Sequence, residues 1–293
     1  MGNHAYLIMA HKNDYTFHTL LKLLDDERNT IFIHMDKKVK DYDPAVVQQL
    51  VLKSQVIHTP HRWNIKWGGD IQIFLELMMM ETALQKGPFT RYHLISGEDL
   101  PIKSQDEIHD FFDQHPDKEF IDFMMGDFRY RVQYYHLLQN KLGKKDEGLI
   151  AKANGFCIRL QQVAGVCRNK DILLAKGANW FSITEKCVNY LLSQKPRIRQ
   201  IFRYTFGCDE LFLQTMLLNT DFMNHLYQPE EGYNSILRQI NWSDAEIPSP
   251  RVYKITDKDN LAASKNMFAR KFDCKVDKEI IDYVAENLAV TKE

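Results

Sequence analysis

The sequence predicts an α/β protein in which helices cover a mainly parallel central sheet. Strand-like and helix-like segments alternate over residues 5–96, which is typical of parallel β-α-β units. Charged residues also stand directly after several of the predicted strands. The carboxyl ends of parallel strands share one edge of the sheet, where ligands of such folds bind, so we expect a binding site at this edge.

Each predicted strand is a short apolar or β-branched run, and each predicted helix has apolar side chains spaced by three and four residues. The expected strands cover residues 5–10, 30–34, 55–57, 92–96, 120–123 and 179–184. The expected helices cover residues 17–24, 70–84, 104–115, 185–192, 210–218 and 277–288. The third helix begins with Ser104 and has Glu107 three residues later, which is the pattern of a capping box.

Chain length and composition favour a single domain over residues 1–293. With 293 residues and 44% hydrophobic residues, the chain can bury one large core. It contains no internal repeat, low-complexity tract or clear linker. Residues 126–177 are basic, aromatic and irregular in pattern, which indicates binding loops or a small helical insertion.

Charge and cysteine content exclude several classes of protein. The net charge of −1 gives no indication of nucleic acid as a partner. Five cysteines without a Cys-x-x-Cys pair favour a reducing compartment. The apolar run at residues 5–10 is too short for a signal peptide or a membrane span. We therefore expect a cytoplasmic protein, with peripheral attachment to a membrane left open.

The motifs of several common enzyme classes do not occur. The sequence has no Gly-x-Gly-x-x-Gly, P-loop, Gly-x-Ser-x-Gly or His-Glu-x-x-His pattern, which removes the commonest dehydrogenase, ATPase, hydrolase and metalloprotease interpretations. Asp-x-Asp occurs at residues 41–43 and 257–259, but neither copy follows a predicted strand. We expect both to be solvated loops, and we expect no metal and no cofactor.

An acidic pair, Asp209-Glu210, begins a predicted apolar helix. Acidic residues are favoured in a first turn because free N–H groups and the helix dipole stabilise negative charge. The other interpretation is that Glu210 is a general base that takes the proton of a hydroxyl group. Asp209 would then be the structural cap. The two interpretations are compatible, because a helix start is a rigid mount for a catalytic group.

Three cations near the end of the chain, Arg251, Arg270 and Lys271, could bind a diphosphate. Guanidinium and ammonium groups suit phosphate oxygens and stabilise charge on a leaving group, although solvated surface charge is an equally ordinary interpretation. Trp242 lies in a polar stretch and is either a platform for a sugar ring or a packing residue.

Six stretches in order resemble the branching β-1,6-N-acetylglucosaminyltransferase family, the core-2/I-branching enzymes, which includes the protein xylosyltransferases. They are residues 6–12, 31–38, 92–103, 177–181, 209–210 and 268–272. The resemblance implies a GT-A-type nucleotide-sugar transferase fold, inversion at the anomeric carbon and independence from divalent metal. It extends from residue 5 to about residue 276.

The resemblance also implies roles for individual residues. Glu210 falls on the catalytic base, with Cys208 in place of the family's proline, and Lys271 falls on the diphosphate-binding lysine. Arg251 falls near the diphosphate-binding arginine. The acceptor-side matches are Trp242, which would stack on the acceptor, and Arg131, which would contact it. The substrate-binding residues expected on the donor side are His11, Asp36, Glu98, Asp99 and Trp180, with Glu98 and Asp99 along the rim of the nucleotide site.

We therefore expect a transferase that moves a sugar, GlcNAc or another hexose, from a UDP-sugar to a hydroxyl of a glycan acceptor. Residues 126–177 would be an insertion on the acceptor side. Animal members of the family have a membrane anchor and disulfides, and neither feature is expected here. The chain is therefore similar to bacterial relatives, and this resemblance implies a protein that works on lipid-linked acceptors for surface polysaccharide at the inner membrane face. Two alternatives stay open: a carbohydrate-binding protein on a transferase fold, and a nucleotide-sugar hydrolase or phosphorylase.

Overall fold

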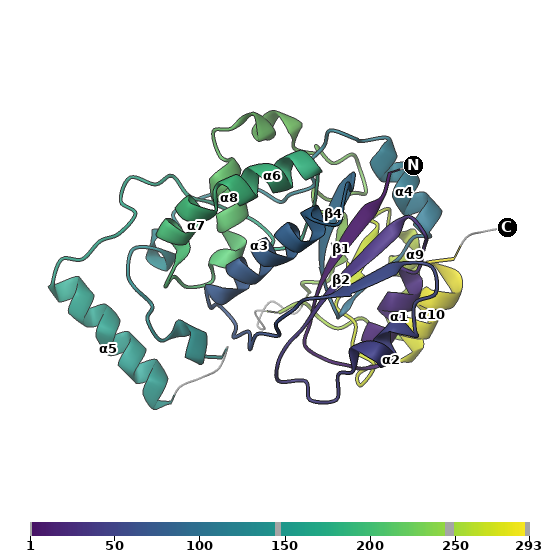
Figure 1. Ribbon diagram of the computed structural model, residues 1–293, viewed down its shortest axis with the longest axis horizontal. Helices are drawn as coiled ribbons and strands as arrows, with labels where there is room; N and C mark the ends of the chain where they lie inside the picture. Colours follow the sequence, from purple (N-terminus) through teal and green to yellow (C-terminus); the bar gives the residue numbers. More distant parts are fainter. Residues whose placement is uncertain (1, 144–147, 244–248, 291–293) are drawn as a thin grey trace.

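A five-stranded sheet forms the centre of the computed structural model, which describes residues 2–143, 148–243 and 249–290 (Figure 1). Its strand order is β3-β2-β1-β4-β8, and β8 alone among these strands pairs antiparallel. The strands are β1 His4–Ala10, β2 Asn29–Met35, β3 Gln55–His58, β4 Arg91–Ser96 and β8 Phe181–Ile183. The predicted fold class, a mainly parallel sheet flanked by helices, is confirmed.

Helices cover both faces of this sheet, and β1 shows how the sequence produces the two layers. Ala5 and Leu7 face one core, while Tyr6, Ile8 and Ala10 face the other. A strand buried on both faces needs apolar residues at every position, which explains its unbroken apolar run. The first core packs against α3 Ile71–Leu84, α6 Glu185–Ser193, α7 Lys195–Phe202 and α8 Phe212–Leu217. The second packs against α1 Tyr15–Leu23, α2 Pro44–Gln48, α4 Gln105–Asp113, α9 Lys258–Ala263 and α10 Glu279–Asn287.

A second sheet brings the end of the chain to the edge of the first. It has the order β5-β10-β9, with β5 Asp99–Pro101, β9 Arg238–Ile240 and β10 Phe268–Arg270. In the antiparallel pairing of β5 and β10, Arg270 lies opposite Asp99. This pairing places residues 268–272 beside the residues that follow β4.

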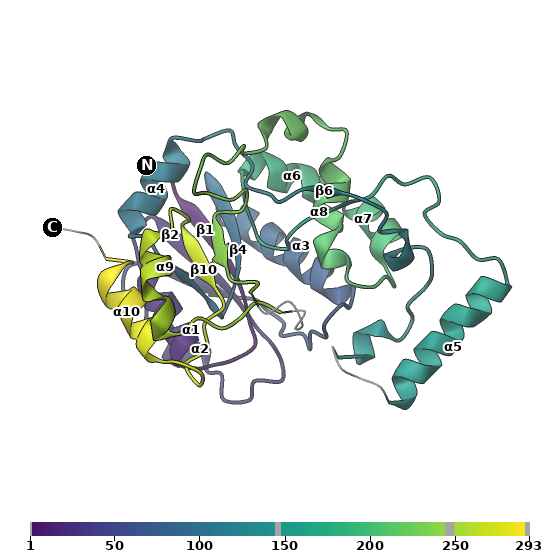
Figure 2. The same ribbon diagram turned by 180° about the vertical axis from the view of Figure 1, so that it is seen from behind.

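Residues 126–143 and 148–177 extend away from the sheets. They contain the long helix α5 Leu149–Val163, which stands apart from the other helices in both Figure 1 and Figure 2. A two-stranded ribbon of β6 Met124–Met125 and β7 Ala175–Lys176 closes the base of this excursion. We name residues 126–177 the excursion below.

Two predicted elements differ from the structure. Residues 120–123 form no strand; Phe120 makes one isolated bridge, to Ser182. The helix predicted over residues 210–218 is split into a 3-10 turn, Cys208–Glu210, and the shorter α8.

The expected role of Asp209 as a helix cap is wrong, because α8 has no side-chain cap and Asp209 Oδ2 accepts a hydrogen bond from Gln72 Nε2 instead (3.1 Å). The capping box of Ser104 and Glu107 is confirmed at the start of α4.

Across the described ranges, none of the helices combines the length and the apolar character that crossing a bilayer requires.

Candidate functional site

A cavity of about 380 Å³ opens at the carboxyl edge of the central sheet. The strands β1, β2 and β4 end here, so the residues that follow them meet, as the sequence predicted. Four of the expected substrate-binding residues line it: His11, Asp36, Glu98 and Trp180. The wall also includes residues from the start of α3 and from β10: Trp67, Gln72, Leu75 and Arg270. We name this cavity the donor pocket, after the substrate that the sequence analysis expects there.

Glu98 is a buried carboxylate that gathers cations at the floor of the donor pocket. Lys12 Nζ lies 2.5 Å and Lys271 Nζ 3.0 Å from its carboxylate oxygens, and His11 Nε2 lies at 3.5 Å. Burial alone would raise the pKa of Glu98, but the hydrogen bond and charge of His11, with the charges of Lys271 and Lys12, hold that pKa well below its usual range. The structure thus brings Lys271 to the carboxyl edge of the central sheet, against a residue of the cavity wall.

Asp99 corrects one expectation. It was expected on the rim, but it is completely buried. Its carboxylate accepts hydrogen bonds from Ser96 Oγ (2.7 Å) and from Arg270 Nη1 (2.9 Å). The guanidinium of Arg270 in turn lies 4.4 Å from the ring centre of Trp180. Asp99 therefore positions Arg270 and Trp180 at the pocket wall and does not itself reach into the pocket.

Arg251 lies on a segment beside Lys271. The backbone N–H of Tyr253, two residues on, donates to the carbonyl of Lys271 (2.9 Å). The guanidinium of Arg251 pairs with Asp257 Oδ1 at 2.5 Å. The first Asp-x-Asp sequence contributes Asp43 as the N-cap of α2, which agrees with its interpretation as a loop. The second was also expected to be a loop, and that expectation is wrong: it spans the end of a 3-10 turn, Ile255–Asp257, and the first residues of α9, where Asp257 pairs with Arg251.

A second hollow of about 380 Å³ contains Glu210 and Trp242. Its wall comes from the base of the excursion and from the segment before β9, and includes Lys176, Gly177 and Gln239. The indole of Trp242 is largely exposed, as a stacking platform must be. We name this hollow the acceptor hollow, after the substrate that the sequence analysis expects there.

Two cations from the excursion hold the carboxylate of Glu210. Arg131 Nη1 lies 2.9 Å and Lys176 Nζ 3.4 Å from Glu210 Oε2. Arg131 also donates to the carbonyl of Gly207 (2.7 Å), which ties it to the turn that carries Glu210. Arg131, which was expected only as an acceptor contact, thus lies beside Glu210, and Lys176 is a further residue that the sequence analysis did not identify. The sequence signal that could have identified Lys176 is its position directly before residues 177–181, one of the stretches that resemble the family.

Residues 177–180 separate the two hollows and line both. Gly177 and Ala178 face the acceptor hollow and Trp180 the donor pocket. The N–H of Gly177 donates to the carbonyl of Glu210 (3.0 Å), which couples this segment to the turn. A side chain at Gly177 would place its Cβ 1.9 Å from the carbonyl oxygen of Asp122, so only glycine allows this approach.

A buried polar network lies beneath the turn. Glu76, on α3, is wholly buried, and the Asn179 side-chain nitrogen, oriented toward it, donates to Glu76 Oε1 (3.1 Å) and to the carbonyl of Asp209 (3.2 Å). Burial raises the pKa of Glu76 well above its usual range. Burial, with the charge of Glu210, raises the pKa of Asp209 to about 6. The sequence analysis missed Glu76, because one acidic residue within an apolar helix carries no motif.

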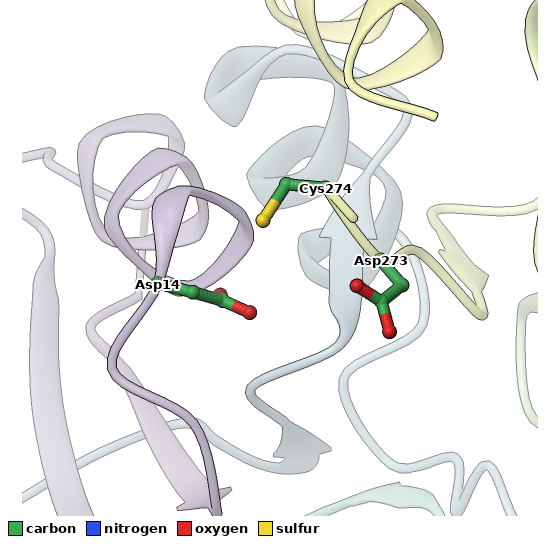
Figure 3. Close-up of side chains that lie close together, drawn as sticks. All are labelled: Asp14, Asp273 and Cys274. Atoms are coloured by element: carbon green, nitrogen blue, oxygen red, sulfur yellow. The ribbon is translucent and has the colours of Figure 1, made fainter. Parts of the chain in front are cut away.

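One group of side chains in the described ranges has the composition of a metal site. It lies next to Lys12, which pairs with Glu98 and also with Asp273 of this group. Asp14, Asp273 and Cys274 point toward one another, with ligand atoms within 4.8 Å (Figure 3). Asp14 caps α1 by accepting from Phe17 N, and Asp273 Oδ2 pairs with Lys12 Nζ at 2.8 Å. An ammonium group at that distance already neutralises the carboxylate, so we interpret this group as a helix cap and an ion pair.

Comparisons with known proteins show the family of this chain. A family model described as Core-2/I-Branching enzyme matches residues 4–263. Xylosyltransferase 2 of Rattus norvegicus is 24% identical, over 95% of this chain and 33% of its own length; xylosyltransferase 1 of Homo sapiens is 23% identical, over 94% and 29%. The chain thus spans about a third of these curated relatives.

Among solved structures, the apo form of mouse xyloside xylosyltransferase 1 aligns with a TM-score of 0.40 at 10% identity, covering 93% of this chain and 98% of that one. The family match covers the acceptor hollow, the turn that carries Glu210 and Arg251; it ends before β10, which contributes Arg270 to the donor pocket. The chain therefore belongs to the core-2/I-branching enzyme family.

Proposed function

We propose that this protein is an inverting glycosyltransferase that moves a sugar from a UDP-sugar to a hydroxyl of a glycan acceptor. The observation that carries the proposal is the pair of hollows on either side of residues 177–180. One carries Lys38 and Arg270 on its wall, with Lys271 held nearby by Glu98, and these cations would suit a nucleotide diphosphate; the other holds the carboxylate of Glu210 beside an exposed indole. A two-substrate transfer needs such neighbouring sites.

The chemistry that fits is a single in-line displacement. The acceptor oxygen would bond to the anomeric carbon while the bond from that carbon to the diphosphate oxygen breaks, and UDP would leave with the electron pair. Glu210 would take the hydroxyl proton as general base. Because the acceptor attacks from the face opposite the leaving group, the anomeric configuration inverts, as in inverting glycosidases.

Separate residues would serve the donor and the acceptor. His11, Asp36 and Trp180 would contact the nucleotide and the sugar in the donor pocket. Lys271 and Arg251 would stabilise the charge that develops on the diphosphate, in place of a divalent metal. Trp242 would stack on the acceptor sugar, and Arg131 would contact the acceptor while it orients Glu210.

The donor sugar is GlcNAc or another hexose in this proposal, and the names of the relatives add xylose as a candidate. The acceptor would be a glycan intermediate of bacterial surface polysaccharide, carried on a lipid. Both choices are tested by measuring UDP release from UDP-GlcNAc, UDP-glucose, UDP-galactose and UDP-xylose with a panel of glycan acceptors.

The proposal expects UDP release from one donor that depends strictly on an acceptor. Equal release without acceptor would instead favour a nucleotide-sugar hydrolase. Binding of UDP-sugars without turnover on any acceptor of the panel would favour a carbohydrate-binding protein that has kept the transferase fold.

A further inference from the structure

Helix α5 is bonded to the rest of the excursion through two of its polar side chains. Asn154, the one buried residue of the helix, accepts a hydrogen bond from the N–H of Leu138 (3.3 Å). Two turns further along the same face, the side chain of Gln161 accepts a hydrogen bond from the N–H of Tyr135 and donates one to its carbonyl (2.7 and 2.9 Å). A helix on a globular protein ordinarily does the opposite and buries its apolar stripe.

The outer face of α5 is apolar and exposed. Leu149, Phe156 and Leu160 are 85%, 61% and 52% exposed, and Val163 is 89% exposed. With Ala153 they recur at spacings of three and four residues, so they form one stripe on the side away from the body of the protein. Such a continuous apolar stripe marks an interaction surface.

The charges beside the stripe have one sign. Lys152 and Arg159 lie on α5, seven residues apart and therefore on one side of the stripe, and both are exposed. Residues 148–170 contain four lysines and arginines and no acidic residue, in a chain whose net charge is −1. The surface is thus cationic as well as apolar.

We propose that α5 docks on an anionic lipid bilayer, with its apolar stripe in the boundary between headgroups and acyl chains and with Lys152 and Arg159 against the headgroups. An amphipathic helix with apolar residues on one side and lysine or arginine beside them has this mode of binding. A second copy of the chain is a poorer occupant, because a two-fold contact would set the same row of cations against itself. Anionic headgroups complement that row.

The purpose of this docking rests on the proposed function: the excursion that carries α5 also supplies Arg131 and Lys176 to Glu210, so docking would place the acceptor hollow close to a lipid-linked acceptor. The docking itself does not depend on transfer. Vesicle binding and UDP binding are measured separately, so either proposal can fail alone.

The test is co-sedimentation of the full chain with vesicles of phosphatidylcholine and phosphatidylglycerol, and with vesicles of phosphatidylcholine alone. The triple variant Leu149→Ser, Phe156→Ser, Leu160→Ser removes the stripe. The matched control is Leu52→Ser, Val46→Ser, Val276→Ser, whose positions are 88%, 53% and 50% exposed elsewhere on the molecule. Melting temperature and UDP affinity verify that both variants are folded.

We expect the wild type and the control to bind anionic vesicles, and the α5 variant to bind roughly tenfold more weakly or worse, since each lost side chain removes apolar contact with the bilayer. The double variant Lys152→Gln, Arg159→Gln should lose about tenfold on anionic vesicles. Equal binding by the α5 variant and the control would overturn the proposal. So would a wild-type dimer that ignores vesicles and that the α5 variant converts to a monomer in light scattering.

Discussion

At the scale of single residues, Glu98 organises the donor pocket by concentrating positive charge. Its buried carboxylate holds Lys12, His11 and Lys271, three residues from the two ends of the chain. A cation kept within 3.0 Å of a buried partner has a fixed position and loses little side-chain freedom when a phosphate binds. This geometry supports the role proposed for Lys271.

The first prediction concerns Lys271. Lys271→Ala should weaken UDP binding by about ten- to a hundredfold, because a charge-assisted contact contributes roughly 1.5–3 kcal/mol. Titration calorimetry with UDP measures the loss. Lys275→Ala removes an exposed lysine four residues away and serves as the control. Equal UDP affinity of the two variants would remove Lys271 from the diphosphate site.

Asp209 yields a prediction about pH. Its folded pKa is raised from 3.8 to about 6, so the folded state holds the proton more tightly than the unfolded state does. Its contribution to stability is complete below about pH 4 and is lost as the pH rises through about 6. Asp209→Asn should therefore raise the melting temperature at about pH 8 and leave it nearly unchanged at about pH 4. A shift of the same size at both pH values would contradict the raised pKa.

At the scale of elements, the segment 177–180 determines how the two hollows are joined. Its close approach to Asp122 depends on Gly177. We expect Gly177→Ala to destabilise the fold by about 1–3 kcal/mol, as overpacking does, and to lower turnover because the segment is bonded to Glu210. Denaturant unfolding and a turnover assay measure both effects.

The control for that variant is Gly155→Ala in α5, where a Cβ meets no atom within 4 Å. It should stabilise by about 0.5–1 kcal/mol, since alanine is the better residue within a helix. If Gly177→Ala were as stable as the wild type and fully active, the segment would not have the positional role described.

The elements also show what could be predicted from the sequence. The parallel strands and their flanking helices follow from local periodicity, and the carboxyl-edge residues His11 and Asp36 follow from strand order. The pairing of β5 with β10 joins Asp99 to Arg270, and no local pattern encodes a contact over that separation. The burial of Asp99 was missed for the same reason. Helix α5 was expected only as an unplaced small helical insertion, one of two alternatives for residues 126–177. Leu149, Ala153, Phe156 and Leu160 have helical spacing, but the basic and aromatic residues around them obscured the pattern.

At the scale of the whole molecule, the chain brings cations from both of its ends to one pocket, and this leads to a prediction about metal. If Lys271 and Arg251 do the work of a divalent cation, transfer should persist in excess EDTA at nearly its full rate. The measurement is turnover before and after chelation, with and without added Mn²⁺. Loss on chelation and recovery with Mn²⁺ would show that a metal takes part and would reopen the two Asp-x-Asp sites.

The central claim is that Glu210 is the general base, and the variant Glu210→Gln tests it most directly. Glutamine keeps the shape and most hydrogen bonds but cannot take the proton, so turnover should fall on the order of 10²–10⁴-fold with donor affinity unchanged. Glu279→Gln, an exposed first-turn glutamate of α10, is the control for loss of a helix-start charge, which costs about 0.3–1 kcal/mol of stability. A Glu210→Gln enzyme as active as the Glu279→Gln control, with the same small drop in melting temperature, would contradict the account.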